Sequence, residues 1–101
     1  MLVIAGTISI DPQKRDAAIG AAVEMMEETR KEAGCISYTF SSDLLEEGLI
    51  HVFEEWASQE ALDGHFTAPH MKAFQVAAAG LGVREMNIQR YDVSAVAPLR
   101  G

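Results

Sequence analysis

Three histidines are the residues of this sequence best suited to proton transfer, because imidazole titrates near neutral pH. His65 ends a short helical segment and could take a proton from a phenol or return one to an intermediate, or it could only cap or pack a helix end. His70 follows Pro69 and faces either the same pocket or solvent. His51 lies mid-strand, where a surface or interface position is expected. We therefore predict His65 as the base and His70 as a second catalytic residue.

A carboxylate lies two residues before the only tryptophan of the sequence. Alternate residues of a strand share a face, so Glu54 is expected to point the same way as Trp56, and Glu55 the other way. Burial there would raise the pKa of Glu54 into a range useful for proton transfer. The alternative is a carboxylate that reaches solvent at the strand end. We include Glu54 among the predicted catalytic residues.

Aromatic side chains could bind a flat substrate. Tyr38 and Trp56 offer rings that stack, with an O–H and an N–H that fix orientation. Their alternative roles are core packing for Trp56 and a satisfied buried hydroxyl for Tyr38, and a pocket wall can be both. Phe40 alternates with Tyr38 along one predicted strand, and Phe74 lies on the apolar face of a predicted helix. Both join the predicted substrate-binding set.

No metal site is expected from the spacing of the histidines. His65 and His70 are five residues apart with a proline between them, whereas two ligands on one helical face need a spacing of three or four. Cys35 is the only cysteine, which excludes an internal disulfide and a cysteine-based zinc cluster. The sequence also has no glycine-rich dinucleotide fingerprint and no phosphate loop. We predict no cofactor.

The elements that must position these residues follow from periodicity and from helix signals. Capping residues and closing glycines separate the segments, and the order is strand, helix, strand, strand, broken helix, strand. This order predicts a single α+β domain over residues 1–101 with a ferredoxin-like antiparallel sheet. The predicted segments are a strand over 2–10, a helix over 12–33, strands over 36–41 and 49–56 joined by a hairpin at 43–48, helices starting at Ser58 and Thr67, and a final strand over 83–96.

Apolar residues on both faces of the predicted strands indicate that the domain works as a homodimer. Leu49 and Phe53 fall on one face, and Val52 and Trp56 fall on the other. A lone copy would expose one of these faces to water, whereas two copies packed sheet to sheet would cover it. The long last strand could extend the sheet of the second copy.

The composition of the chain limits the kinds of binding partner that are expected. The formal net charge is -7, and the longest basic runs are pairs, so binding to nucleic acid or to an anionic membrane is not expected. The apolar start of the chain has no cationic segment before it, and no uncharged apolar run approaches the length of a spanning helix. A chain with a single cysteine suits a reducing compartment, and we therefore expect a cytoplasmic protein.

The run from Phe53 to His65, followed by Pro69-His70 and then Phe74, resembles the central signature of the antibiotic biosynthesis monooxygenase family. Upstream, Gly34-Cys35 and Tyr38 resemble the preceding strand of that family, and the match covers roughly residues 1–93. The resemblance implies a dimeric α+β barrel with a pocket between the sheet and the helices, lined from the strands and from the short helix. Members include cofactor-independent monooxygenases of polyphenols and quinols, haem-degrading enzymes and an isomerase of a signalling sugar phosphate.

Two departures from the family pattern affect the expected activity. Haem-degrading relatives use an asparagine and a histidine where this sequence has Thr7 and Gln75, so haem binding is not expected. Thr7 is retained as a predicted substrate-binding residue. Polyketide-tailoring relatives use an asparagine at the place of Val52.

The function expected from these features is cofactor-independent oxidation of a small phenolic, quinol or polyketide-like aromatic substrate by O2. His65 would remove the phenolic proton, and the electron-rich anion would then reduce O2 directly, which explains why no flavin or metal motif is needed. Two alternatives remain open. One is a proton-shuttling isomerase that uses the same residues, and the other is a non-catalytic stress protein that binds a small ligand.

Overall fold

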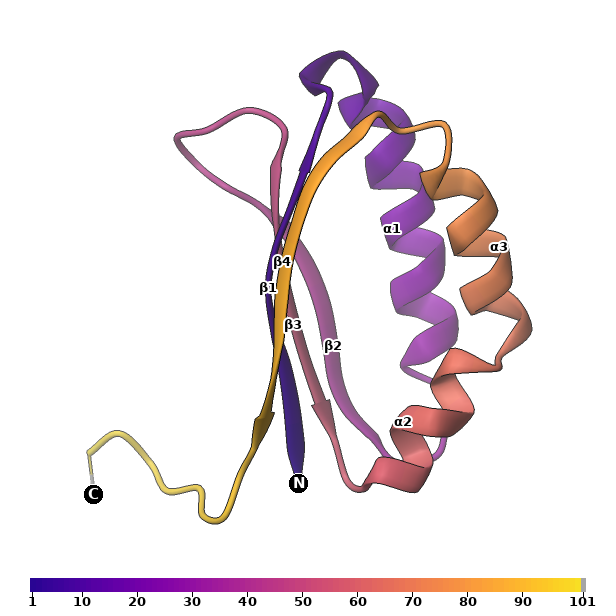
Figure 1. The fold of residues 1–101 in the computed structure, drawn as a ribbon. Coiled ribbons are helices and arrows are strands. Elements are labelled where there is room, and N and C mark those ends of the chain that lie inside the picture. Colours follow the sequence, from indigo (N-terminus) through magenta and orange to yellow (C-terminus); the bar gives the residue numbers. More distant parts are fainter. Residues whose placement is uncertain (101) are drawn as a thin grey trace.

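The computed structural model describes residues 1–100, and within this range one antiparallel sheet is covered on one face by α-helices (Figure 1). The strand order is β2-β3-β1-β4, which with the chain order gives the ferredoxin-like α+β arrangement expected from the sequence. The elements are β1 (Leu2–Ile10), the 3-10 helix η1 (Pro12–Lys14), α1 (Arg15–Thr29), β2 (Cys35–Ser42), β3 (Leu49–Trp56), α2 (Gln59–Phe66), α3 (Pro69–Ala78) and β4 (Val83–Asp92).

The first helix is shorter than predicted. An Asp11 side chain accepts a hydrogen bond from the backbone N–H of Gln13 and starts η1, and α1 then ends at Thr29 rather than continuing to residue 33. The Arg30 side chain turns back to donate a hydrogen bond to the carbonyl oxygen of Tyr38. Residues 31–33 form turns that end at Gly34, whose φ of 82° lies in the left-handed region that glycine adopts at helix ends. Glu32 therefore lies in this turn and not in the helix.

Pairing between strands fixes which residues face the helices. Glu54 of β3 lies opposite Ile4 of β1 and opposite Tyr38 of β2, and Trp56 lies opposite Leu2. Leu2, Tyr38 and Trp56 belong to a buried cluster that the helices cover. The parity prediction for Glu54 and Trp56 is therefore confirmed.

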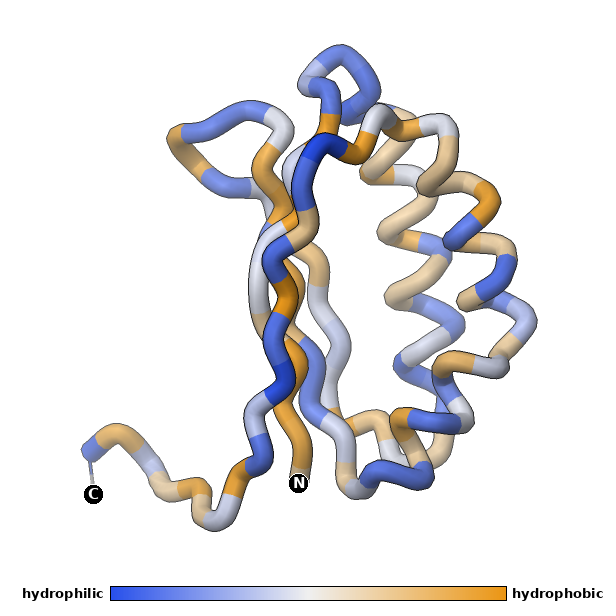
Figure 2. Tube along the Cα trace, in the orientation of Figure 1, coloured by the Kyte–Doolittle hydropathy of each residue, from blue (hydrophilic) through white to orange (hydrophobic). Residues whose placement is uncertain are grey.

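The core has two parts along the sheet. At the α2 end, Leu2, Tyr38 and Trp56 pack with Met25 of α1 and Leu62 of α2. At the other end, a second cluster joins the sheet to α1 and to the α3–β4 connection, and its buried members are Ile10, Ala18 and Leu81. Figure 2 shows hydrophilic and hydrophobic residues mixed along β4, whereas the start of β1 is continuously apolar.

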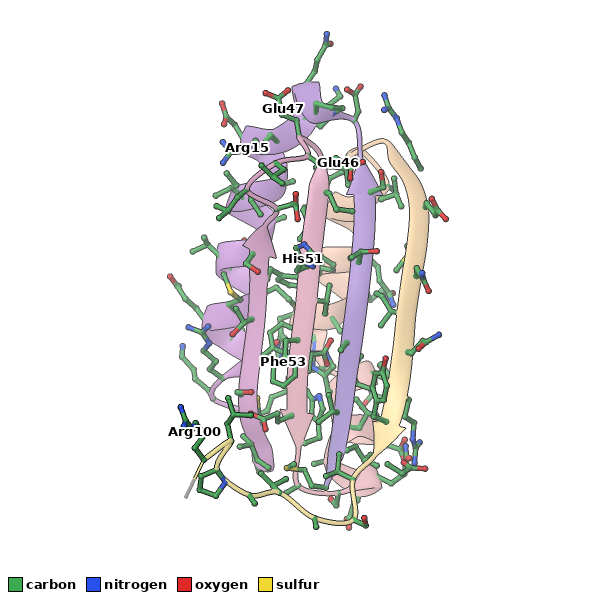
Figure 3. All side chains as sticks on the ribbon, turned by 90° about the vertical axis from the view of Figure 1, so that its left-hand side faces the viewer. Arg15, Glu46, Glu47, His51, Phe53 and Arg100 are labelled. Carbon is green, nitrogen blue, oxygen red and sulfur yellow. The ribbon has the colours of Figure 1, made fainter. Side chains whose placement is uncertain are left out.

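The outer face of the sheet is a mixture of apolar and polar side chains. His51 and Phe53 of β3 point to this side in Figure 3. Phe53 is 44% exposed, and Tyr91 of β4, which lies opposite Val3 of β1, is 49% exposed. Thr7 lies opposite His51 and therefore also lies on this face. Leu49 and Phe53, which are expected to share one face of the strand, both lie on this side.

The last strand is also shorter than predicted. It ends at Asp92, which lies opposite Leu2, and one more backbone hydrogen bond follows, from the N–H of Val93 to the carbonyl oxygen of Met1. The segment 93–100 leaves the sheet as irregular chain (Figure 1). Within residues 1–100 no helix has both the length and the apolar character needed to cross a membrane.

Candidate functional site: one carboxylate shared by two histidines

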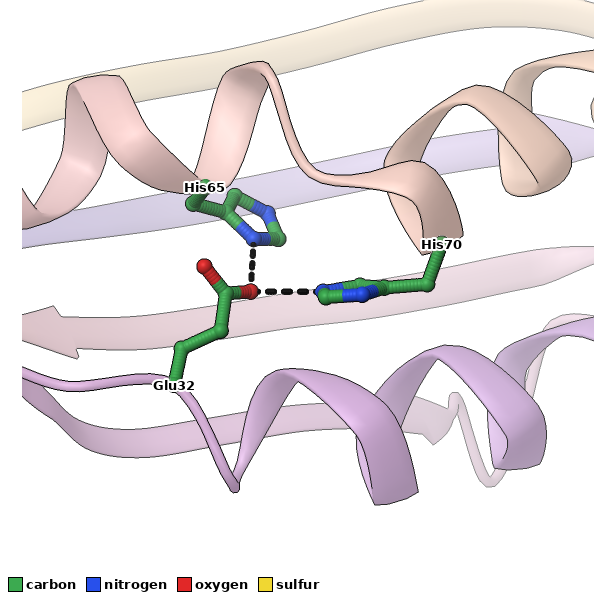
Figure 4. A group of neighbouring side chains, drawn as sticks. All are labelled: Glu32, His65 and His70. Carbon is green, nitrogen blue, oxygen red and sulfur yellow. Dashed lines mark hydrogen bonds and ion pairs between the residues drawn. The ribbon is translucent and has the colours of Figure 1, made fainter.

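One carboxylate oxygen contacts both histidines that the sequence singles out (Figure 4). Oε2 of Glu32 lies 2.7 Å from Nδ1 of His65 and 2.6 Å from Nε2 of His70. These distances are those of strong hydrogen bonds to a charged acceptor. We call these three side chains the Glu32–His65–His70 group. The sequence left open whether the histidines share one site, and the structure brings them to the same oxygen.

Two short helices and a turn position this group. His65 lies in the last turn of α2, which begins where the Ser58 side chain accepts a hydrogen bond from the backbone N–H of Ala61. The chain then turns at Thr67, and Pro69 starts α3 with its fixed φ. His70 is the second residue of α3, so its ring points back toward the end of α2. Glu32 reaches both rings from the turn after α1.

His65 is the most enclosed member of the group. Its side chain is 1% exposed, and its ring centroid lies 4.8 Å from that of Trp56 and 5.3 Å from that of Tyr38. An ionised carboxylate only accepts hydrogen bonds, so Nδ1 of His65 donates to Glu32. Nε2 is buried and has no hydrogen-bond partner within residues 1–100, and we call it the bare nitrogen of His65. In this tautomer the bare nitrogen carries a lone pair and can act as a base.

Glu54 is a second titratable group at this end of the core. It is 8% exposed, and one of its oxygens accepts a hydrogen bond of 2.9 Å from Nε1 of Trp56. Burial raises the pKa of Glu54 to about 7; the Trp56 hydrogen bond lowers the pKa, and the charge of Glu32 raises it. Glu54 can therefore exchange a proton near neutral pH. The pKa of the neighbouring Tyr38 hydroxyl is raised well above its usual range by burial and by the charge of Glu54.

A cavity between the sheet and the helices lies away from this group. It has a volume of about 60 Å³ and a purely apolar lining that includes Ile8 of β1, Ala22 of α1 and Leu81. Phe40 and Phe74 also line it, and their rings stack with centroids 5.5 Å apart. The family resemblance implies a pocket lined partly from α2, but this cavity is lined from the strands, from α1 and from α3.

All the predicted site residues except Thr7 lie between the sheet and the helices, and His70 is joined to His65 through Glu32. His65 contacts Trp56 and Tyr38, and the tryptophan links it to Glu54, so these four side chains form one buried cluster. The predicted substrate-binding residues Phe40 and Phe74 line the apolar cavity.

Thr7, a predicted substrate-binding residue, lies apart from the other predicted residues. It lies on the outer face of the sheet, whereas Phe40 and Trp56 lie on the face that the helices cover. Successive strand residues point to alternate faces, and Thr7 is out of phase with the buried Leu2 and Ile10 of the same strand. In this chain it cannot share a site with the other predicted residues.

Sequence reasoning missed Glu32. An acidic residue just after the end of a helix is unfavourable next to the negative end of the helix dipole, and this local conflict is the one signal by which the sequence could have indicated Glu32. The spacing of His65 and His70 along the chain does not decide whether they can share a ligand, because the two residues lie on different helices. Glu32, His65 and His70 place three possible ligand atoms within 4.8 Å of one another.

The fold and this group define the class of protein: a ferredoxin-like α+β domain with acid–base side chains between its sheet and its helices. Residues 1–77 match the family described as antibiotic biosynthesis monooxygenase. The chain belongs to this family.

Two curated proteins illustrate the relationship. The chain is 33% identical over 93 residues to the uncharacterized protein sll1783 of Synechocystis, and the match covers 92% of this chain and 63% of that protein, so the chain spans less than two thirds of this relative. It is 23% identical over 94 residues to a Bacillus subtilis protein named "Putative monooxygenase YcnE", covering 93% of this chain and 99% of that protein.

Among solved structures, an antibiotic biosynthesis monooxygenase from Deinococcus radiodurans, so described with the qualifier "putative", superposes with a TM-score of 0.91. The two chains are 26% identical, and the superposition covers 100% of each. The ferredoxin-like fold is thus shared with this family over the whole chain.

Proposed function

We propose that this protein is a cofactor-independent monooxygenase that oxidises a small phenolic, quinol or polyketide-like aromatic substrate with O2, using His65 as the base. The observation that carries the proposal is the Glu32–His65 pair. Nδ1–H of His65 donates a hydrogen bond to Oε2 of Glu32, with 2.7 Å between the nitrogen and the oxygen. This leaves the bare nitrogen free to accept a proton. The same arrangement of carboxylate, imidazole and free lone pair activates hydroxyl groups in hydrolases.

The reaction needs no redox group because the substrate supplies the electrons. The bare nitrogen of His65 takes the proton of a phenolic O–H, and Glu32 stabilises the imidazolium that forms. The substrate anion transfers electrons to O2, and a C–O bond forms to give a hydroperoxide at a ring carbon that still carries a hydrogen. Loss of water from this hydroperoxide breaks the O–O bond and leaves a carbonyl. One oxygen atom enters the product and the other leaves as water.

The surrounding side chains support binding and proton return. The rings of Trp56 and Tyr38 next to His65 suit contact with a flat substrate. Glu54, with its pKa raised to about 7, can return a proton to the peroxide oxygen at neutral pH. Since the side chain of His65 is 1% exposed, the proposal requires that the connection between α2 and α3 opens to admit the substrate. Phe66, in this region, is 56% exposed.

Oxygen uptake with a panel of quinols and anthrones, without added flavin, haem or metal, tests the proposal. We expect wild type to consume O2 faster than the spontaneous autoxidation of the substrate. Both His65→Gln and Glu32→Gln should lose activity, the first by roughly 10²- to 10⁴-fold, which is the usual contribution of a general base. His51→Gln is the matched control, because His51 lies on the outer face and binds Asp43 instead. Uptake no faster than autoxidation would remove the oxygenase proposal.

A proton-shuttling isomerase is the second candidate, and the sharing of one carboxylate oxygen by two imidazoles favours it. One histidine could take a proton from a substrate while the other returns a proton elsewhere, with Glu32 passing charge between them. Turnover that continues without O2 would support the isomerase. Tight binding of an aromatic ligand that survives His65→Gln, with no product formed, would instead indicate a binding protein.

We also propose that the protein is a homodimer. The support is the outer face of the sheet, where Phe53 and Tyr91 are about half exposed although both are large and apolar or aromatic. Light scattering should give a mass near twice the 11.0 kDa of one chain. A monodisperse mass of one chain at micromolar concentration would contradict the dimer.

A further inference from the structure

The Glu32–His65–His70 group has the composition of a transition-metal site. Two imidazole nitrogens and one carboxylate oxygen lie within 4.8 Å of one another. This donor set suits Zn²⁺ and its neighbours in the first transition series, whereas Mg²⁺ and Ca²⁺ prefer oxygen ligands. We propose that this group binds one divalent transition cation, such as Zn²⁺ or Co²⁺, with water as a fourth ligand.

Small movements would convert the hydrogen-bonded group into a coordination site. Ligands about 2.0–2.1 Å from a tetrahedral ion are about 3.3 Å apart. The carboxylate oxygen now lies 2.7 Å and 2.6 Å from the two nitrogens, so these two separations must widen by less than an ångström. The two nitrogens lie within 4.8 Å of each other and must approach by up to about 1.5 Å. Glu32 lies in a turn, and the side chains of Glu32 and His70 are 16% and 17% exposed, so both can move. His65 is the fixed ligand.

A cation can reach the group from solvent. Glu32 lines an open hollow on the surface together with Gly34, Ser58 and Gly64, which leaves room for a water ligand on that side. The net charge of -7 attracts cations to the molecule. The site therefore has an entry path and a favourable field.

The environment of His65 limits the affinity. A histidine that binds a metal usually donates its other ring N–H to a neighbouring acceptor, and losing such an outer contact costs roughly 10- to 100-fold in affinity. When Nδ1 of His65 binds the ion, the proton moves to the bare nitrogen, which has no acceptor in the described part of the chain. We therefore expect micromolar rather than nanomolar binding of zinc.

This inference goes beyond the proposed function, because metal binding and base catalysis exclude one another. An ion on Nδ1 leaves the bare nitrogen protonated and occupies the oxygen of Glu32 that orients the ring. The metal-bound form is then inactive as a base, and zinc acts as an inhibitor of the metal-free form.

The direct test is zinc binding by titration calorimetry on chelator-treated protein, with Co²⁺ absorption as a second readout of ligand geometry. Wild type should bind one Zn²⁺ per chain, and Co²⁺ should give the visible bands of a tetrahedral site. Glu32→Gln and His70→Asn should each weaken binding by more than the roughly 10- to 100-fold cost of an outer-shell partner. Their partial exposure makes both variants suitable, and circular dichroism confirms that they fold.

The matched controls are His51→Gln, which removes the remaining histidine, and Cys35→Ser, which removes the only thiol. Both should bind zinc as wild type does. Absence of stoichiometric binding at 100-fold excess of zinc, or equal binding by all the variants, would overturn the inference. Because binding is measured without substrate, this result is independent of whether the oxygenase proposal holds.

Discussion

Replacing Glu54 by glutamine should stabilise the fold at pH 8 and leave its stability almost unchanged near pH 4.5. The glutamine has the shape of the protonated carboxyl group and can still accept the hydrogen bond from Nε1 of Trp56. In wild type, burial raises the pKa of Glu54 from 4.5 to about 7. The folded state therefore holds a proton between these pH values that the unfolded state has released.

The sign and size of the effect follow from this difference. Where the folded state binds more protons than the unfolded state, the free energy of unfolding falls as pH rises. The contribution of Glu54 is thus fully favourable below pH 4.5 and is lost between pH 4.5 and about 7. One pKa unit is worth about 1.36 kcal/mol, so the buried charge costs about 3 kcal/mol at pH 8. Glu54→Gln removes this cost.

Urea denaturation followed by circular dichroism at several pH values between 4.5 and 8.5 measures the effect. The difference in unfolding free energy between Glu54→Gln and wild type should grow by about 3 kcal/mol over this range. Glu55→Gln is the matched control, because Glu55 points to the outer face and accepts a hydrogen bond from Ser37. A difference for Glu54→Gln that does not change with pH would refute the reasoning that Glu54 is buried next to Trp56.

Three further substitutions test how the site is held. Gly34→Ala should destabilise the fold by at least about 1 kcal/mol in urea, because φ is 82° and the added Cβ would lie 2.5 Å from that of Ala61. Ser58→Ala removes the side chain that caps α2 and should cost about 1 kcal/mol in the same assay. Trp56→Phe removes a hydrogen bond that lowers the pKa of Glu54, so the fall of stability with pH should extend to higher pH than in wild type.

The sequence predicted most of the fold because its signals are local. Alternation along β3 placed Glu54 and Trp56 on the buried face, and the glycine after residue 33 marked the turn that follows α1. The predictions were wrong at the ends of helices and strands, because contacts with distant residues determine where these elements end. The last paired residue of β4, Asp92, lies opposite Leu2 of β1, so the end of this strand depends on a residue 90 positions away.

The candidate site was predictable only in part. His65 and His70 were recognisable by residue type, but the carboxylate that joins them lies 33 positions before His65 and belongs to another element. No periodicity links residues across such a distance. The same limit explains Thr7, which was chosen by its place in a family pattern, although its strand phase puts it on the outer face.

The tautomer of His65 is the most direct test of the account, since both the proposed base and the metal site depend on which ring nitrogen faces Glu32. Long-range proton–nitrogen NMR spectra of ¹⁵N-labelled, chelator-treated protein at pH 8 distinguish the two nitrogens. We predict a protonated Nδ1 and an unprotonated Nε2 for His65, with this preference lost in Glu32→Gln. A protonated Nε2 with an unprotonated Nδ1 in wild type would contradict the account.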